Sequence, residues 1–417
     1  MKNQIYPVKP ISFKLGGAES SEIAQYLHAM YFKHRLEYLN KCKKIPGSSL
    51  VRSWNWYYKE VLLESIHRVS RSGRRIKKVY GIPLTKQFLD IIKMSLSLPA
   101  RPQEYYIFDL FKQPNREVAR EYIFRHEVKN VLYKMLINTP KIAKKSPLTN
   151  KGRFARKALR NGLAIAPTIC TINKGKVKYY NEHSPQGDVF VKTLSGRGGK
   201  GADLWQYDQE TNLFTHSKVK GKYKLEDVLE LYSKKSKKES YIFQQKVSNH
   251  PDLSEIACNA LSTCRIVTML NENDQPEVVT AVLRMAARAD SIVDNIHRGG
   301  IAAPIDIIDG RLGKATNLGV VDRVERLSNH PVSGAKIEGR ELPFWPDAIS
   351  AALHAHEVFR PRVIIGWDIA ITAFGPVIIE GNAQPCVDLI QRPYDKPLGN
   401  SRFGELLAYH LRKLNFG

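Results

Sequence analysis

The chain lacks the features that mark several common protein classes. Its 417 residues include five scattered cysteines, none of them in a CxxC pair: Cys42, Cys170, Cys258, Cys264 and Cys386. Their spacing indicates neither a disulfide framework nor a zinc knuckle, and a reducing cytoplasm is the simplest compartment. No apolar run approaches the roughly 18 residues of a membrane span. The N-terminal stretch also lacks the long apolar core of a secretory signal. We therefore expect a cytoplasmic protein.

Acidic residues are scarce compared with basic ones, above all in the first third of the chain. The chain holds 65 Lys and Arg residues but 40 Asp and Glu residues, a net charge of +25. Residues 1–150 hold 28 of the basic and 11 of the acidic residues, with dense basic tracts at 41–44 and 71–78. The excess of positive charge has two main interpretations: it forms a solvated basic face, or it attracts an anionic substrate or the inner surface of a membrane. Nucleic acid is the least favoured partner, because no nucleic-acid-binding motif is found.

The hydrophobic pattern divides the chain into a helical part and a mixed part. Helical spacing in residues 18–70, 85–98 and 116–136 predicts a basic, mainly helical N-terminal region over 1–145. After a polar, proline-bearing boundary, strand patterns alternate with helices, so we expect an α+β fold. Helices are expected near 151–161, 225–234, 346–358 and 402–413. The predicted strands are 188–193, 203–207, 241–247, 263–270, 278–287, 303–308, 363–372 and 376–380.

The most informative segment is GWDIAITAFGPVIIEGNAQP, residues 366–385. Two apolar runs flank a turn around Phe374, which predicts a hairpin with Asp368 opposite Glu380. Glu380 and Asn382 are two residues apart and share a face of their strand. Carboxylates that face each other repel unless a cation lies between them, and oxygen ligands of this kind suit Mg²⁺ or Mn²⁺. The alternative is that both acids are solvated at strand ends.

A glycine-rich loop follows a short strand that ends near Lys192. Its glycines allow backbone amides to approach phosphate oxygens, and the lysine supplies a counter-charge. The glycine spacing formally matches GxGxxG, but residues 202–207 read as a strand where a dinucleotide fold needs a helix. A glycine-rich hairpin over a nucleotide fits better, with an ordinary flexible loop as the alternative. The loop residues expected to contact the nucleotide are Ser195, Gly196, Gly198, Gly199 and Gly201.

Two further segments complete the candidate nucleotide site. Lys151 opens a helix just past the boundary, where it is either a phosphate ligand or a surface lysine. The strand 241–247 ends in polar residues and could offer backbone groups to an adenine ring, with Asp252 as a ribose acceptor; the alternative is a plain sheet strand. The residues assigned to this edge are Gln244, Gln245, Val247 and Asp252.

Two arginines lie inside apolar strands, Arg265 in TCRIVT and Arg284 in VTAVLRM. A buried guanidinium must find an anion or a strong acceptor. The pair therefore indicates a phosphate or carboxylate site, or else two structural salt bridges. A polar loop that is expected near the same face supplies the candidate substrate residues Asn295, Arg298, Gly299 and Gly300.

These features together resemble the ATP-grasp superfamily over residues 146–417. The resemblance implies two α+β lobes with ATP between them, an N-lobe over 146–240 and a C-lobe over 241–417. It implies that Lys151 and Lys192 contact phosphates and that Asp368, Glu380 and Asn382 hold Mg²⁺. One departure is Gln245, which stands where many members of the superfamily have an acid. The segments 263–268, 293–300, 304–306 and 366–371 resemble more closely the sugar-transfer-associated group, which is linked to surface polysaccharides.

The resemblance implies an ATP-dependent carboxylate–amine ligase that works through an acyl phosphate. Lys192, Arg265 and Arg284 are the expected catalytic residues, with Asn295 and Arg298 orienting the acceptor. The expected substrates are a uronic acid of a capsular or other surface polysaccharide precursor and an amine. One alternative is a kinase that phosphorylates a sugar hydroxyl. The other is a non-catalytic basic protein that binds an anionic polymer, and the basic N-terminal region could associate with a membrane or with glycan assembly.

Overall fold

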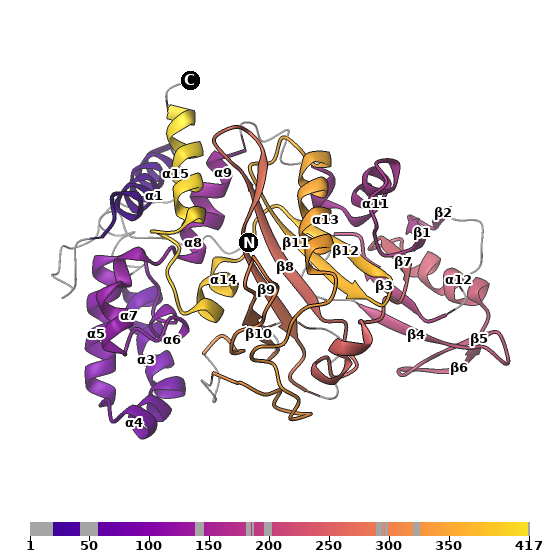
Figure 1. Cartoon of the computed structure of the whole chain (residues 1–417), viewed down its shortest axis with the longest axis horizontal. Coiled ribbons are helices and arrows are strands. Elements are labelled where there is room, and N and C mark those ends of the chain that lie inside the picture. Colours follow the sequence, from indigo (N-terminus) through magenta and orange to yellow (C-terminus); the bar gives the residue numbers. More distant parts are fainter. Residues whose placement is uncertain are drawn as a thin grey trace.

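The computed structural model describes residues 20–41, 57–137, 146–180, 185, 187–195, 202–288, 294, 296, 299–319 and 326–415. A five-stranded and a seven-stranded antiparallel sheet lie side by side, and the N-terminal helices lie on the other side of the five-stranded sheet (Figure 1). The predicted α+β fold with a helical N-terminal region is confirmed. None of the helices in these ranges is long and apolar enough to cross a membrane.

The N-terminal region combines one long helix with many short helical segments. Its α-helices are α1 (Glu22–Lys41), α3 (Glu64–Arg68), α4 (Arg74–Tyr80), α5 (Leu84–Ser97), α6 (Glu104–Ile107), α7 (Gln113–Glu117), α8 (Arg125–Glu127) and α9 (Tyr133–Met135). The π-helical turns η1 (Tyr57–Leu63), η2 (Val69–Gly73) and η4 (Val128–Leu132) and the 3-10 turn η3 (Ala119–Glu121) join them.

The helical block predicted over 116–136 is interrupted in the structure by a short extended segment. The chain is extended at Tyr122 and Phe124, where ψ is 133° and 143°. Between them, the backbone of Ile123 exchanges hydrogen bonds with the side chain of Gln391, at 3.0 and 2.8 Å. A contact with a residue far along the chain therefore breaks the local helical pattern.

The seven-stranded sheet has the order β2-β1-β7-β3-β4-β5-β6. Its strands are β1 (Thr168–Asn173), β2 (Lys176–Tyr179), β3 (Val189–Thr193), β4 (Asp203–Asp208), β5 (Leu213–His216), β6 (Val219–Tyr223) and β7 (Tyr241–Gln245). Helix α12 (Leu225–Lys235) packs on it through Val228, Leu229 and Tyr232. Because β7 pairs with β1 and β3, the lobe boundary predicted at 240/241 falls just before a strand of this sheet.

The five-stranded sheet has the order β10-β9-β8-β11-β12. Its strands are β8 (Thr263–Leu270), β9 (Pro276–Met285), β10 (Ile301–Pro304), β11 (Ile364–Thr372) and β12 (Gly375–Asn382). The associated helical segments are η5 (Pro147–Thr149), α11 (Lys151–Arg160), η6 (Pro251–Ile256), α13 (Trp345–Val358), α14 (Val387–Tyr394) and α15 (Arg402–Asn415). The predicted strand 303–308 is shorter than expected, because the chain turns after β10.

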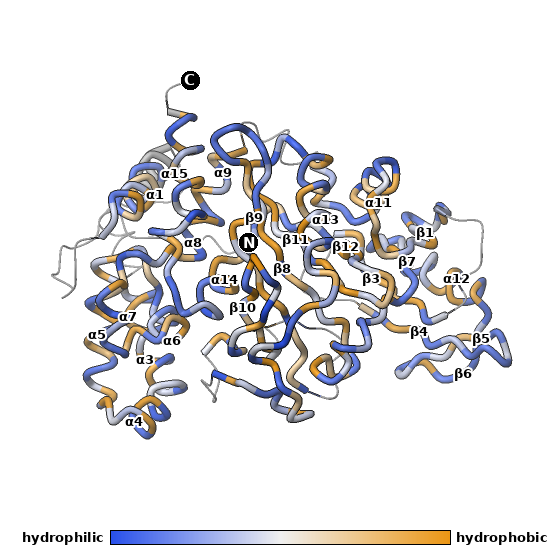
Figure 2. The backbone as a smooth tube through the Cα atoms, in the orientation of Figure 1, coloured by the Kyte–Doolittle hydropathy of each residue, from blue (hydrophilic) through white to orange (hydrophobic). Residues whose placement is uncertain are grey.

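Helices cover both faces of the five-stranded sheet. On β8, Ile266 packs in the core that α11 and α13 share, whereas Val267 and Met269 pack with α1, α14 and α15. This alternation follows from the two-residue period of a strand. Because helices cover both faces of the sheet, β8 and β11 are apolar along most of their length (Figure 2).

Candidate active site

The hairpin of β11 and β12 places two acids opposite each other. Asp368 pairs with Glu380, and Thr372 pairs with Gly375 across a two-residue turn. Gly375 has a φ of 111°, which side chains rarely tolerate. A β-bulge between Asp368 and Ile369 shifts the register by one residue. The predicted hairpin and the Asp368–Glu380 pairing are confirmed.

Asp368 is buried between two arginines from the neighbouring strands. Arg265 lies directly across from it on β8, and its Nε donates to Oδ1 at 2.5 Å. Arg284 reaches from β9 and donates from Nη2 to the other oxygen, Oδ2, at 3.1 Å. Burial alone would raise the pKa of Asp368, but the two guanidinium groups outweigh it and hold the pKa below its ordinary value. The carboxylate is therefore ionised at neutral pH.

A third acid, which was not among the predicted site residues, completes this cluster. Asp294 accepts a 2.5 Å hydrogen bond from Thr263 and lies 3.2 Å from Nη2 of Arg284. Burial raises the pKa of Asp294, and Arg284 opposes that rise. The sequence offered a signal for Thr263 as a site residue, because it precedes Arg265 by two residues and therefore lies on the same face of the strand. Asp294 stands directly before the predicted substrate residue Asn295.

Asn382 joins the two acids of the hairpin. Its Nδ2 lies 3.3 Å from Glu380 Oε1 and 3.5 Å from Asp368 Oδ2. The described ranges contain no group of three or more His, Cys, Asp or Glu that could hold a metal. The predicted set instead offers two carboxylates and one amide, which are hard oxygen donors of the kind that Mg²⁺ accepts. The donor types therefore fit Mg²⁺. Asp368 would share its two oxygens between the metal and the arginines Arg265 and Arg284.

Lys192, the predicted phosphate ligand, lies on β3 of the seven-stranded sheet. It is half-buried near the end of β3, and its Nζ lies 5.0 Å from the centre of the Phe190 ring. Burial lowers the pKa of Lys192, the carboxylate of Glu380 opposes this, and the nearby Lys151 adds to it. The charge state of Lys192 therefore depends on both Lys151 and Glu380.

Lys151 is held at the start of α11. Asn150 caps the helix by accepting from the amide of Arg153 at 3.0 Å, and the amide of Lys151 donates to Leu194 at 3.1 Å. The preceding turn, η5, packs on β12 at Gly381, where a Cβ would lie 2.7 Å from Leu148. Gly381 therefore permits the close approach that sets the start of α11 beside Glu380 and Asn382.

The predicted nucleotide edge lies at the end of β7. The side chain of Gln244 is buried and donates to Thr168 at 3.2 Å, and the amide of Gln245 donates to Pro167 at 2.9 Å. Val247 follows the strand and is half-buried. Asp252 is exposed in η6, with Oδ2 3.6 Å from Nδ1 of His250. Gln244 is thus the buried member of this set, Gln245 and Val247 are half-buried, and Asp252 is exposed.

The loops that flank the cluster are described in part. Ser195 is exposed at the end of β3, whereas Gly196, Gly198, Gly199 and Gly201 lie outside the described residues. The same is true of the substrate candidates Asn295 and Arg298. Gly299 and Gly300 lead into β10, and Gly299 has a φ of 92°. The assignments for the outside residues stay predictions.

A family model matches most of the second part of the chain. The model is described as sugar-transfer associated ATP-grasp, and it matches residues 128–403. This range contains each predicted site residue. No curated protein matches the chain significantly.

Solved structures with a related arrangement are ligases and synthetases at low identity. A D-alanine–D-alanine ligase from Bacillus anthracis is 12% identical with a TM-score of 0.36, covering 64% of this chain and 69% of that one. The D-alanyl-alanine synthetase A from Vibrio cholerae O1 biovar eltor is 11% identical with a TM-score of 0.36, covering 65% and 66%. An N5-carboxyaminoimidazole ribonucleotide synthetase in complex with ADP is 14% identical with a TM-score of 0.34, covering 61% and 52%.

Proposed function

Because the chain belongs to the sugar-transfer-associated ATP-grasp family, we propose that it is an ATP-dependent carboxylate–amine ligase. The observation that carries this proposal is the Asp368–Glu380–Asn382 hairpin, against which η5 packs at Gly381 just before Lys151. Lys151 and Lys192 would supply the cations and the hairpin acids would hold the metal, the two parts that phosphoryl transfer uses.

The phosphate-binding part of the site consists of Lys151 and Lys192. Their ammonium groups would neutralise the charge of the ATP phosphates and hold the γ-phosphate in line for attack. Asp368, Glu380 and Asn382 would hold Mg²⁺, which when bound supplies charge stabilisation at the phosphates. The loop after Ser195 would cover the triphosphate, while Val247 and Asp252 would contact adenosine.

Arg265 and Arg284 would act on the carboxylate substrate. A substrate carboxylate oxygen attacks the γ-phosphorus, the bond to ADP breaks, and an acyl phosphate forms. An amine then attacks the acyl carbon, phosphate leaves, and the amine loses a proton to give an amide. The two guanidinium groups would orient the carboxylate and stabilise the oxyanion of the tetrahedral intermediate.

We further propose that the carboxylate substrate is a uronic acid of a surface polysaccharide or its precursor. Two observations support an anionic sugar: the family is described by its association with sugar transfer, and the chain carries a net charge of +25. The acceptor would be an amino acid or another amine, bound near Asn295, Arg298, Gly299 and Gly300.

The test is ADP release by the purified protein with Mg²⁺-ATP against a matrix of uronic acids and amines, with products identified by mass spectrometry. We expect ADP and an amide with at least one pair, and a hydroxamate when hydroxylamine replaces the amine. ADP with a phosphorylated sugar and no hydroxamate would show a kinase instead. No ADP with any pair, together with no ATP-dependent thermal shift, would overturn the ligase proposal.

A further inference from the structure

The adjoining segments η1, α3, η2 and α4 form one continuous helix, which we call the 57–80 helix. The junction residues Leu63, Arg68 and Gly73 keep α-helical backbone angles, so no segment ends before the next one begins. An α-helix repeats about every 3.6 residues, so a row of residues spaced by four would wind around its axis. The wider π-helical turns η1 and η2 counteract this drift, and residues four apart therefore stay in line.

This alignment gives the 57–80 helix a buried side and an exposed side. Every fourth residue from Val61 to Gly73 is buried, and Val69 packs in a core cluster of the N-terminal helices. Two further rows are exposed, and neither contains an acid. We call them the exposed helix face, and its members are Tyr58, Leu62, Ile66, Ser70 and Arg74 in one row and Lys59, Leu63, His67 and Arg71 in the other.

The first half of the exposed helix face is mainly apolar. Tyr58, Leu62, Leu63 and Ile66 are 50%, 37%, 44% and 52% exposed. They follow one another at spacings of three and four residues, so they adjoin on the helix surface and form one patch. Single exposed apolar side chains are common in soluble proteins, whereas an adjoining group of them indicates a contact surface.

The second half of the exposed helix face is basic and continues into the last turn of α4. Its exposed cations are Arg71, Arg74, Lys77 and Lys78. The described part of the chain offers an ion pair to none of these four, whereas the half-buried Arg68 pairs with Glu64 at 2.6 Å. The acids of this helix, Glu60 and Glu64, are half-buried in a neighbouring row. The exposed positive charge is therefore available to an anionic partner.

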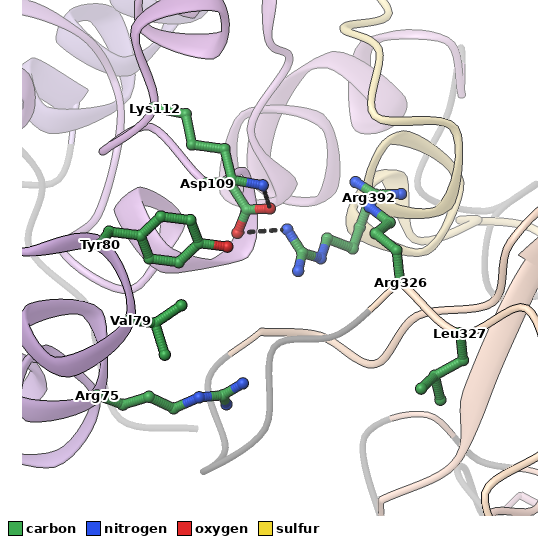
Figure 3. Close-up of a pocket in the computed structure, with 8 residues that line it drawn as sticks. All are labelled: Arg75, Val79, Tyr80, Asp109, Lys112, Arg326, Leu327 and Arg392. Atoms are coloured by element: carbon green, nitrogen blue, oxygen red, sulfur yellow. Dashed lines mark hydrogen bonds and ion pairs between the residues drawn. The ribbon is translucent and has the colours of Figure 1, made fainter.

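The exposed helix face lies away from the candidate active site. In Figure 1, α3 and α4 lie on one side of the five-stranded sheet, and β3 with Lys192 lies on the other. A partner docked on this face would therefore not cover Lys192. Val79 and Tyr80 at the end of α4 line a cavity that this helix shares with α14 (Figure 3), so we do not count them as part of the face.

We propose that the exposed helix face docks on a bilayer that contains anionic phospholipids. The apolar half would enter the headgroup region, and the basic half would contact the lipid phosphates. Binding of a helix to such an interface grows with the apolar area that it buries and with its attraction to anionic lipids, and this face offers both. A soluble anionic polymer would use the cations but would gain little from the apolar patch.

The first test is cosedimentation of the whole chain with phosphatidylcholine vesicles, with and without phosphatidylglycerol. We expect binding to the anionic vesicles that weakens as salt is added. Arg71→Gln with Arg74→Gln should weaken this binding about 25-fold, because each cation near an anionic surface contributes about fivefold. Lys176→Gln with Lys178→Gln is the matched control, since it removes two exposed cations from β2 of the seven-stranded sheet.

The second test removes the apolar half by Leu63→Gln with Ile66→Gln. Both side chains are about half exposed, so the unfolding midpoint should change little, while vesicle binding should weaken about tenfold. The matched control is Leu159→Gln with Tyr179→Gln, at side chains that are 48% and 57% exposed outside the 57–80 helix. Dextran sulfate replaces the vesicles in a parallel titration, and sedimentation velocity records the oligomeric state of each variant.

Vesicle binding that falls in both double variants and in neither control supports the proposal. Absence of binding to the anionic vesicles by the folded wild type overturns it. Binding to vesicles and dextran sulfate that depends on the arginines alone would show a polyanion surface instead. If the Leu63 and Ile66 changes alter the oligomeric state but not vesicle binding, the face joins two copies of the chain, and the membrane proposal is overturned.

Discussion

At the scale of single residues, the centre of the candidate active site is a buried charge cluster. Asp368 is 3% exposed and contacts Arg265 and Arg284. Removing one partner of a buried ion pair typically costs about 3–5 kcal/mol of stability. Substitution of Asp368 would therefore damage both the proposed metal site and the fold. Lys192 is a cleaner probe, because its Nζ contacts an aromatic ring and has no direct ion pair among the described residues.

Lys192→Gln should abolish most of the proposed ligase activity while leaving the fold intact. Glu380 and Asp368 favour the charged form of this ammonium group, which is the expected counter-charge to the ATP phosphates. Loss of one such electrostatic group typically costs about 10²–10³-fold in rate. The measurement is kcat/KM for ADP release, with the unfolding midpoint recorded beside it. Lys157→Gln is the control, since Lys157 likewise lies over a ring, 5.2 Å from the centre of Phe359. Equal activity of the two variants would count against the phosphate role of Lys192.

Glu104 predicts a pH dependence of stability. It is fully buried at the start of α6, and burial raises its pKa from 4.5 to about 8, although the amide of Arg101 opposes this rise. Between these values the folded chain keeps a proton that the unfolded chain has lost, so stability falls as the pH rises through this window. Each pKa unit corresponds to about 1.4 kcal/mol.

Glu104→Gln should remove this dependence, because the amide is neutral at every pH and can still accept from Arg101. We expect the variant to match the wild type near pH 5 and to be more stable by a few kcal/mol near pH 9. Urea unfolding at both pH values measures the difference. A stability difference that is the same at both pH values would show that Glu104 is charged in the folded protein.

At the scale of elements, the contact of η5 with β12 connects the start of α11 to the hairpin. Gly381 lies between Glu380 and Asn382, and a Cβ there would come within 2.7 Å of both Leu148 and Trp367. The backbone amide of Ile378 also donates to Ala164 at 2.8 Å. The chain just past the helical region and the hairpin are thus held together at two points.

Gly381→Ala should lower the stability and weaken ATP binding together. The added methyl group overpacks the contact, which typically costs about 1–3 kcal/mol. Relief by movement of η5 would displace Lys151 from the hairpin. Chemical unfolding and calorimetric titration with ATP measure the two effects. Gly187→Ala is the comparison for stability, because its Cβ would meet only Gln245, at 3.5 Å. If Gly381→Ala lowers the stability but leaves the ATP affinity unchanged, η5 does not position the nucleotide site.

The elements that could be predicted from the sequence are those whose pattern arises locally. The β11–β12 hairpin was predictable because alternation and a turn lie within one short segment, and β8 matched its predicted bounds. The break within 116–136 could not be predicted, because a hydrogen bond with the distant Gln391 sets the backbone conformation at Ile123. The role of Asp294 was hidden for the same reason, because its partners Thr263 and Arg284 come from two other strands.

At the scale of the whole molecule, the N-terminal helices and the five-stranded sheet share a core. Leu27, Tyr31 and Leu132 pack in one cluster with Met269 of β8 and Leu407 of α15. The family match begins at residue 128, within η4 of this cluster. The cavity lined by residues of α4 and α14 lies at the same junction. The N-terminal region is therefore part of the folded body, and its unfolding should be coupled to that of the five-stranded sheet.

Gln391→Leu tests this coupling. The Gln391 side chain is fully buried on α14, donates to Ile123 at 2.8 Å, and accepts from Ile123 and Leu398 at 3.0 Å each. Leucine keeps the volume but leaves these backbone groups buried without partners, at about 1–3 kcal/mol for each. We expect a lower midpoint in denaturant and faster proteolysis near 119–127, whereas Gln206→Leu on the exposed face of β4 should change neither. If Gln391→Leu unfolds like the wild type, the N-terminal helices gain little from this contact, and the shared apolar core alone must hold them to the sheet.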